Sequence, residues 1–106
     1  VGKRFFFNQS VEVEVGSVPK EFALAQNYPN PFNPSTTIGF TLQVSGFTSL
    51  KIYDAIGREV AILVNEVKDA GYYSTTFNAK NFASGIYFAR LLSNGNSQIK
   101  KLSLMK

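Results

Sequence analysis

Apolar and polar residues alternate along most of this chain, in short runs that are separated by turn-forming residues. The alternation is strict at 11–15 (VEVEV), where the valines face one way and the glutamates face the other. Six further runs show the same two-residue period, and none shows the period of a helix. These runs are 36–42, 47–54, 58–67, 71–79, 85–92 and 98–105. The pattern therefore predicts a chain built from β-strands.

Because successive side chains of a strand point to opposite faces, each run has one face that we expect to be buried. Asn94-Gly95 is the strongest hairpin signal, since both residues tolerate positive φ. A short strand near 22–24 brings the count to about seven, and the spacing predicts an all-β, immunoglobulin-like antiparallel β-sandwich. The pattern does not set the order of the strands. The side chains assigned to the core include Ile38, Phe40, Leu42, Leu50, Ile52, Tyr73, Phe77, Leu102 and Leu104.

The stretch GSVPKE (16–21) has the composition of a hinge. We therefore expect 1–16 to be the terminal strand of a preceding β-domain or a linker, and 17–106 to be the folded domain. The alternative is that 1–15 form the first strand of this same domain. The chain begins in mid-pattern at Val1 without an initiator Met, so we expect it to be a piece of a longer protein.

The composition argues against catalysis. The 106 residues are 44% hydrophobic and 17% charged, which is typical of a folded domain, but they include no Cys, His or Trp. These absences exclude a disulfide, a thiolate zinc site and the commonest general base, and a true antibody-type domain as well. The seven acidic residues are scattered except for Glu12 and Glu14. We expect a non-catalytic module with no metal and no cofactor.

The net charge of +4 is mild, and the basic residues are spread along the chain apart from those near its end. A nucleic-acid-binding protein clusters Lys and Arg with exposed aromatic residues, and no such cluster occurs here. No apolar run approaches the ~20 residues that cross a bilayer. The sequence thus predicts neither a nucleic-acid partner nor a transmembrane segment.

The stretch NYPNPFNPST (27–36) is unusual, because three prolines and three asparagines surround two aromatic residues. Each proline fixes its own φ and biases the preceding residue toward an extended conformation, so the segment is stiff and is not a central strand. One interpretation is a cover for a sheet edge that pins Tyr28 and Phe32 against the sandwich. The other is a preformed surface that another protein recognises.

Four blocks of the sequence resemble one known family. In order and spacing, FALAQNYPNPFNPSTTIGFTL, LKIYDAIGREVAILVNEVKDAGYYSTTFNA, FASGIYFARLL and IKKLSLMK are similar to the type A C-terminal sorting domain of type IX secretion (Por secretion). The resemblance covers about 20–106. It implies an immunoglobulin-like sandwich that is itself the export signal, recognised by the outer-membrane translocon after passage through the periplasm. It also implies an N-terminal passenger, a sortase-like peptidase that cuts between passenger and signal, and a final location at the cell surface or in the medium.

The same resemblance implies which residues the translocon recognises. They are Pro29, Asn30, Pro31 and Phe32 in the first motif, Gly57 and Arg58 in the second, Gly85 and Tyr87 in the third, and Lys100, Lys101 and Lys106 in the terminal strand. The cleavage zone would comprise Val15, Gly16, Ser17 and Val18. Since a strand alternates, Lys100 and Lys101 should point to opposite faces. Gly57 and Gly85 are also explained as turn glycines, and Arg58 as a solvated charge.

Other functions remain open from the residues alone. A carbohydrate-binding or adhesive β-sandwich attached to an extracellular hydrolase would need an exposed aromatic platform, for which Tyr72, Tyr73 and Tyr87 are the candidates. Tyr73 shares its face with Phe77, which favours a place in the core instead. Asp54, Asp69 and Asn78 lie beside turns, and we expect them to cap those turns rather than to bind Ca²⁺. A purely structural spacer is a further alternative.

Overall fold

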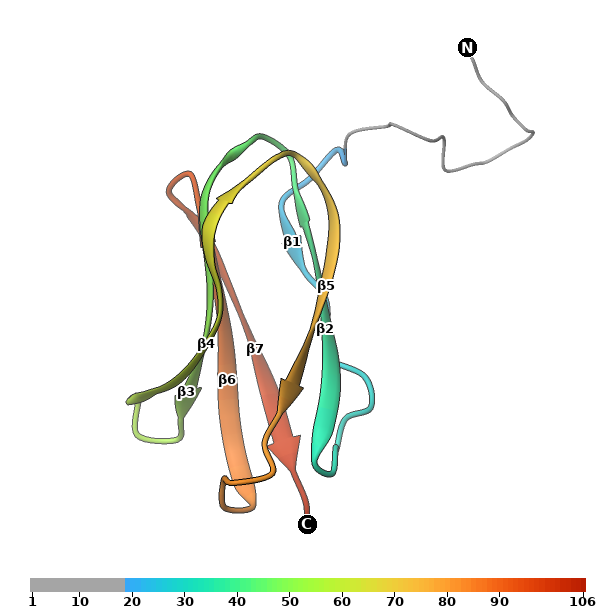
Figure 1. Ribbon diagram of the computed structural model, residues 1–106, viewed down its shortest axis with the longest axis vertical. Helices are drawn as coiled ribbons and strands as arrows, with labels where there is room; N and C mark the ends of the chain where they lie inside the picture. The colour runs from blue at the N-terminus through green and yellow to red at the C-terminus, as the bar shows by residue number, and fades with distance from the viewer. Residues whose placement is uncertain (1–18) are drawn as a thin grey trace, which may run out of the picture.

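The computed structural model describes residues 19–106, which form two packed antiparallel sheets (Figure 1). Within these residues the seven strands are β1 (Ala23–Leu24), β2 (Ser35–Leu42), β3 (Gly46–Asp54), β4 (Glu59–Lys68), β5 (Gly71–Asn78), β6 (Gly85–Ser93) and β7 (Asn96–Leu104). One sheet has the order β1-β2-β5 and the other β4-β3-β6-β7. The predicted β-sandwich is confirmed, whereas the predicted strand at 11–15 and the boundary between 16 and 17 lie outside the described residues.

The strand order specifies the kind of sandwich. In a constant-type immunoglobulin domain the fourth strand lies in the sheet of the first, second and fifth. Here β4 pairs with β3 instead, from Gly46 opposite Lys68 to Tyr53 opposite Glu59. Two register shifts interrupt this pairing, and such irregularities bend an edge strand and discourage a further strand from adding to it. The result is a three-stranded sheet packed on a four-stranded one.

The core lies between the inner faces of the two sheets. The alternation predicted its members correctly, because every apolar residue assigned to it is buried except Tyr73, which is half-buried. The core also encloses one polar pair, since the hydroxyls of Thr48 and Ser93 lie 2.9 Å apart where β3 pairs with β6. Each hydroxyl gives the other a hydrogen-bond partner, which removes the cost of burying it alone.

The hairpin between β6 and β7 is also as predicted. Asn94 and Gly95 both adopt positive φ, and Ser93 pairs with Asn96 on either side of them. The Asn94 side chain donates a hydrogen bond of 3.1 Å to the carbonyl of Ser45. The hairpin is thereby tied to the connection between β2 and β3, at the end of the sandwich opposite to the C-terminus (Figure 1).

Candidate functional site

The first three sequence motifs and the last residues of the fourth meet at one end of the sandwich, which we call the motif end and define as residues 29–34, 54–58, 79–87 and 103–106. It is the lower end in Figure 1, where β3 and β7 finish and where β2 and β6 begin. The antiparallel topology brings these segments together although they are far apart in the sequence.

The first motif covers the free edge of the terminal strand. The Phe32 amide donates to the carbonyl of Ser103 at 2.9 Å, and the Phe32 carbonyl accepts from the Met105 amide at 3.0 Å. The side-chain oxygen of Asn30 accepts a third hydrogen bond, from the Ser103 amide. Higher on the same edge, the Gln26 side chain donates to the carbonyl of Lys101. These contacts confirm the predicted edge cover, which occupies backbone groups that would otherwise invite another strand.

The two aromatic residues of this segment take opposite positions. Phe32 is only 2% exposed, and its ring lies 5.9 Å from that of Phe77. Tyr28 is 81% exposed, so the prediction that it packs against the sandwich is wrong. The reason lies in the backbone pairing: Tyr28 exchanges two hydrogen bonds with Thr37, whose side chain is exposed on the outer face of β2. Directly paired residues share a face, so Tyr28 also points outward.

A buried polar network that the sequence analysis missed keeps the proline-rich segment closed. Asn27, which is buried, donates to the Thr36 hydroxyl at 3.0 Å and to the Pro29 carbonyl at 3.1 Å. The Thr36 hydroxyl donates in turn to the same carbonyl. The available signal was the Asn two residues before a proline, because Asn side chains readily bond to nearby backbone in turns.

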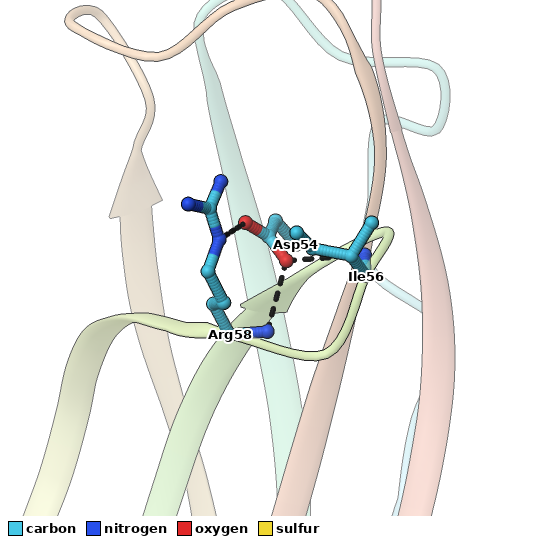
Figure 2. Close-up of polar contacts among 3 residues, drawn as sticks. All are labelled: Asp54, Ile56 and Arg58. Carbon is cyan, nitrogen blue, oxygen red and sulfur yellow. Dashed lines mark hydrogen bonds and ion pairs between the residues drawn. The ribbon is translucent and has the colours of Figure 1, made fainter.

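The second motif is a tight turn that an aspartate closes (Figure 2). One carboxylate oxygen of Asp54 accepts from the amides of Ile56 and Arg58, and the other accepts from the Arg58 guanidinium at 2.8 Å. The prediction that Asp54 caps its turn is therefore confirmed. Gly57 has a φ of +91°, which L-residues rarely adopt. The hydrogen bond from the Arg58 amide is the main cause of the lowered pKa of Asp54, with the guanidinium adding to it against partial desolvation.

The third motif forms a tyrosine corner. Tyr87 lies two residues into β6, is buried, and donates its hydroxyl to the carbonyl of Ala83 at 2.7 Å. In immunoglobulin-like sandwiches a Tyr near the start of the sixth strand makes this contact with the backbone just upstream. Its ring also continues a row of aromatic residues, 6.0 Å from Phe82, which lies 5.5 Å from Phe77. The sequence resemblance singles out this tyrosine, but the corner itself becomes visible only in the structure.

The end of the chain is bonded to the loop that precedes β6. The backbone amide of Lys106 donates to the Ser84 hydroxyl at 3.1 Å, and its ammonium group donates to the carbonyl of Lys80 at 2.7 Å. Next to this loop, the second and third motifs enclose a shallow hollow of about 290 Å³. Its lining residues are Asp54, Ala55, Ile56, Arg58, Ser84, Gly85, Ile86 and Tyr87.

The other predicted site residues lie elsewhere. Lys100 is half-buried and pairs with Ala89, whereas Lys101 is exposed and pairs with Phe88, so the two point to opposite faces as predicted. Both lie farther up β7 than the motif end. The predicted cleavage zone at 15–18 is outside the described residues.

The alternative of a sugar-binding platform fails on geometry. Tyr72 is exposed on the outer face of β5, but Tyr73 stacks on Phe40 at 5.3 Å, and Tyr87 is buried. The three tyrosines therefore do not share a surface. Asn78 caps its turn by accepting from the Lys80 amide, as expected. The same expectation for Asp69 is wrong: within 19–106 its carboxylate accepts no hydrogen bond, and it is its backbone carbonyl that accepts from the Tyr73 hydroxyl at 2.6 Å.

Among residues 19–106, no group of three acidic side chains is placed to hold a metal ion. In the same residues, no helix has the length and apolarity needed to cross a membrane.

The fold is that of an immunoglobulin-like module, and the residues of its sequence motifs form the surface at one end of the sandwich. A family model described as the secretion system C-terminal sorting domain matches residues 26–105, and the chain belongs to this family. The domain is thus a C-terminal sorting signal for type IX secretion that directs export to the cell surface or the medium, and the family is one of non-catalytic sorting signals. Neither curated proteins nor solved structures gave a match.

Proposed function

We propose that the motif end is the surface which the outer-membrane type IX machinery recognises, and that this chain acts without catalysis or a cofactor. The observation that carries the proposal is that the first three motifs and residues 103–106 come together at one end of the sandwich, where Phe32 bonds to Ser103 and Met105, and Lys106 bonds to Ser84. Phe32 and Tyr87 are buried and fix the shape of this end. The side chain of Arg58 is 73% exposed and that of Ile56 is also exposed, so a partner could contact both.

A test should separate recognition from stability. Ile56 and Val44 are both exposed aliphatic residues in turns between strands, but Ile56 is at the motif end and Val44 is at the opposite end. Each residue is replaced by Gln in the sorting domain of a fusion to a passenger protein, and the amount of exported passenger is measured. Ile56→Gln should reduce export and Val44→Gln should not, with equal melting temperatures. Equal export of the two variants would contradict recognition at the motif end.

Lys100 and Lys101, which lie farther up β7 than the motif end, test whether the machinery also recognises the charge of the terminal strand. An acidic groove in the receptor would favour Lys100 and Lys101, so changing both to Glu should impair export and leave the circular dichroism spectrum unchanged. The structure sharpens this test, because Lys101 is exposed and Lys100 is half-buried. Lys101→Glu alone should therefore account for most of the effect. Normal secretion of the double variant would show that the export machinery does not recognise these charges.

The upstream part of the proposal concerns 1–18. We propose that 1–16 end a preceding passenger domain or link it to the sorting domain at 17–106, and that a sortase-like peptidase cuts within 15–18. No nucleic acid takes part. The intact mass of the secreted parent protein tests both statements: a C-terminus near Ser17 supports them, and a retained domain contradicts cleavage.

A further inference from the structure

The two outer faces of the sandwich differ sharply in chemistry. On the three-stranded sheet, the outward positions of β2 and β5 carry mainly small polar residues such as Thr37, Ser74 and Thr76, with the exposed Tyr72 as a large side chain among them. On the four-stranded sheet, exposed large apolar residues occur on every strand, among them Phe47, Ile62, Leu92 and Ile99. We call this second surface the four-strand outer face.

The strand register shows which outward side chains lie next to one another across the sheet. One row runs Ile62, Lys51, Arg90, Ile99 from β4 to β7, and the next runs Glu59, Tyr53, Phe88, Lys101. The rows therefore place apolar groups around two neighbouring cations at the centre of the face. The row on the other side of these cations, Asn65, Ser49, Leu92 and Ser97, is mostly polar, so the face mixes apolar and polar positions around the two cations, as protein-interaction sites do.

The central pair of cations is unfavourable for the isolated domain. Lys51 and Arg90 are directly opposite each other on neighbouring strands, and like charges in this position destabilise a sheet. Lys51 is relieved by Glu59, whose carboxylate lies 3.3 Å from the ammonium group. Arg90, in contrast, is exposed and makes no ion pair with any residue in 19–106. Because no ion pair within the described residues offsets the charge of Arg90, its position is better explained by binding than by the stability of the fold.

The surface is hollowed beside this arginine. A groove of about 440 Å³ is lined by Tyr53, Gly57, Phe88, Arg90, Ser97 and Ile99. Gly57 belongs to the turn of the second motif, so the groove continues from the motif end onto the sheet. Apolar walls around one guanidinium would hold an apolar group and a carboxylate together, since arginine binds carboxylates through two parallel hydrogen bonds.

We propose that the four-strand outer face is a second docking surface, occupied by a protein of the export machinery that presents apolar side chains bordered by carboxylates. This inference rests on the proposed function, because it assumes that the machinery binds the folded domain. A second copy of this chain is a poor occupant, as it would bring Lys51 and Arg90 against the same two cations. A lipid surface fits less well, since the apolar groups lie on the flat of a sheet and not on a protruding loop.

Replacing Arg90 tests the proposal, because stability and docking should then change in opposite directions. Arg90→Gln removes the charge that repels Lys51, so the melting temperature of the domain should stay equal or rise. Docking should weaken about tenfold or more, since the partner's carboxylate would lose its charged ligand. Lys20→Gln is the matched control, because it removes one exposed positive charge near β1, away from this face. A residue with a merely structural role would instead lower the melting temperature along with export.

The occupant is identified by cross-linking the full-length precursor in cells that export it, with a photoreactive p-benzoylphenylalanine at position 99. A cross-link to an acidic segment of a type IX component that falls about tenfold with Arg90→Gln, and not with Lys20→Gln, supports the proposal. Cross-links to a second copy, to the passenger or to lipid, or none at all, overturn it.

Deleting 19–106 separates this inference from the proposed function. If the deletion stops export while Arg90→Gln exports normally, this inference fails and the proposed function stands; if export survives the deletion, the proposed function fails.

Discussion

Phe32 and Leu104 lie side by side in a parallel bridge, so that the first motif of the domain and its last strand are built as one unit. Both side chains are buried, and the backbone of Phe32 bonds to the residues on either side of Leu104. The motif end therefore forms only when the C-terminal strand is in place. A partner that recognises this end recognises a completed fold as well as a sequence.

The two aromatic residues of the proline-rich segment should differ strongly in their contribution to stability. Phe32→Ala leaves a cavity beside Phe77 and should lower the free energy of unfolding by ~3–5 kcal/mol, the range for buried Phe→Ala changes. Tyr28→Ala removes an exposed ring and should change it by less than ~0.5 kcal/mol. Urea unfolding followed by circular dichroism measures both. Similar losses in the two variants would mean that Phe32 is not the anchor of the segment.

The alternation of apolar residues was enough to predict the strands and their buried faces, because burial in a sandwich follows the two-residue period directly. Leu50 and Ile52 are examples, as they are fully buried where the pattern placed them. The pattern could not predict that β4 pairs with β3, since an edge strand has a similar alternation in either sheet. Nor could it separate Phe32 from Tyr28, because their positions depend on backbone pairing, of Phe32 with Leu104 far along the chain and of Tyr28 with Thr37 across the proline-rich turn.

The residues of the candidate site were named from a resemblance, and the structure gives them different physical roles. Tyr87 matches a family motif, yet it is buried and its hydroxyl is bonded to Ala83. This contact depends on the loop conformation before β6, which no local pattern specifies. The cap formed by Asp54 was predictable, because the aspartate and its hydrogen-bond donors are within four residues of each other.

The tyrosine corner should contribute measurably through its single hydroxyl. Tyr87→Phe removes the hydrogen bond to the Ala83 carbonyl, and because Ala83 is exposed and water can replace the hydroxyl, the cost should be that of an ordinary hydrogen bond, ~0.5–1.5 kcal/mol. Tyr72→Phe is the matched control, since the hydroxyl of Tyr72 belongs to an exposed side chain on β5 and its loss should be near neutral. Thermal unfolding by calorimetry measures the difference. Equal melting temperatures for the two variants would mean that the hydrogen bond of Tyr87 does not stabilise the domain.

The turn at 54–58 should lose stability in acid. The pKa of Asp54 is lower in the folded protein than in the unfolded chain, chiefly because of the hydrogen bond from the Arg58 amide. The resulting stabilisation is complete at pH values above the usual carboxyl pKa of about 4 and is lost as the pH falls through the folded pKa. Asp54→Asn should therefore be less stable than the wild type at pH 7, and the difference should shrink toward pH 2–3.

Melting temperatures of the two proteins across this range test the prediction. The control is Asp69→Asn, in the exposed turn between β4 and β5, where within the described chain the carboxylate accepts no hydrogen bond. A difference between wild type and Asp54→Asn that stays constant with pH would mean that the charge of Asp54 does not support the turn.

Two glycines with the same backbone strain can separate the shape of the motif end from the stability of the domain. Gly57 has a φ of +91° and Gly95 a φ of +79°, and in both cases an added Cβ would meet open space. Changing either to Ala should therefore cost a similar ~1–2 kcal/mol, from the backbone conformation alone. Gly57 shapes the turn at the motif end, whereas Gly95 is in the hairpin at the opposite end. If the exported passenger is scored alongside urea unfolding, Gly57→Ala should reduce export well below Gly95→Ala at equal stability. Equal export of the two would mean that the cell monitors only how well the domain is folded, and not the shape of this end.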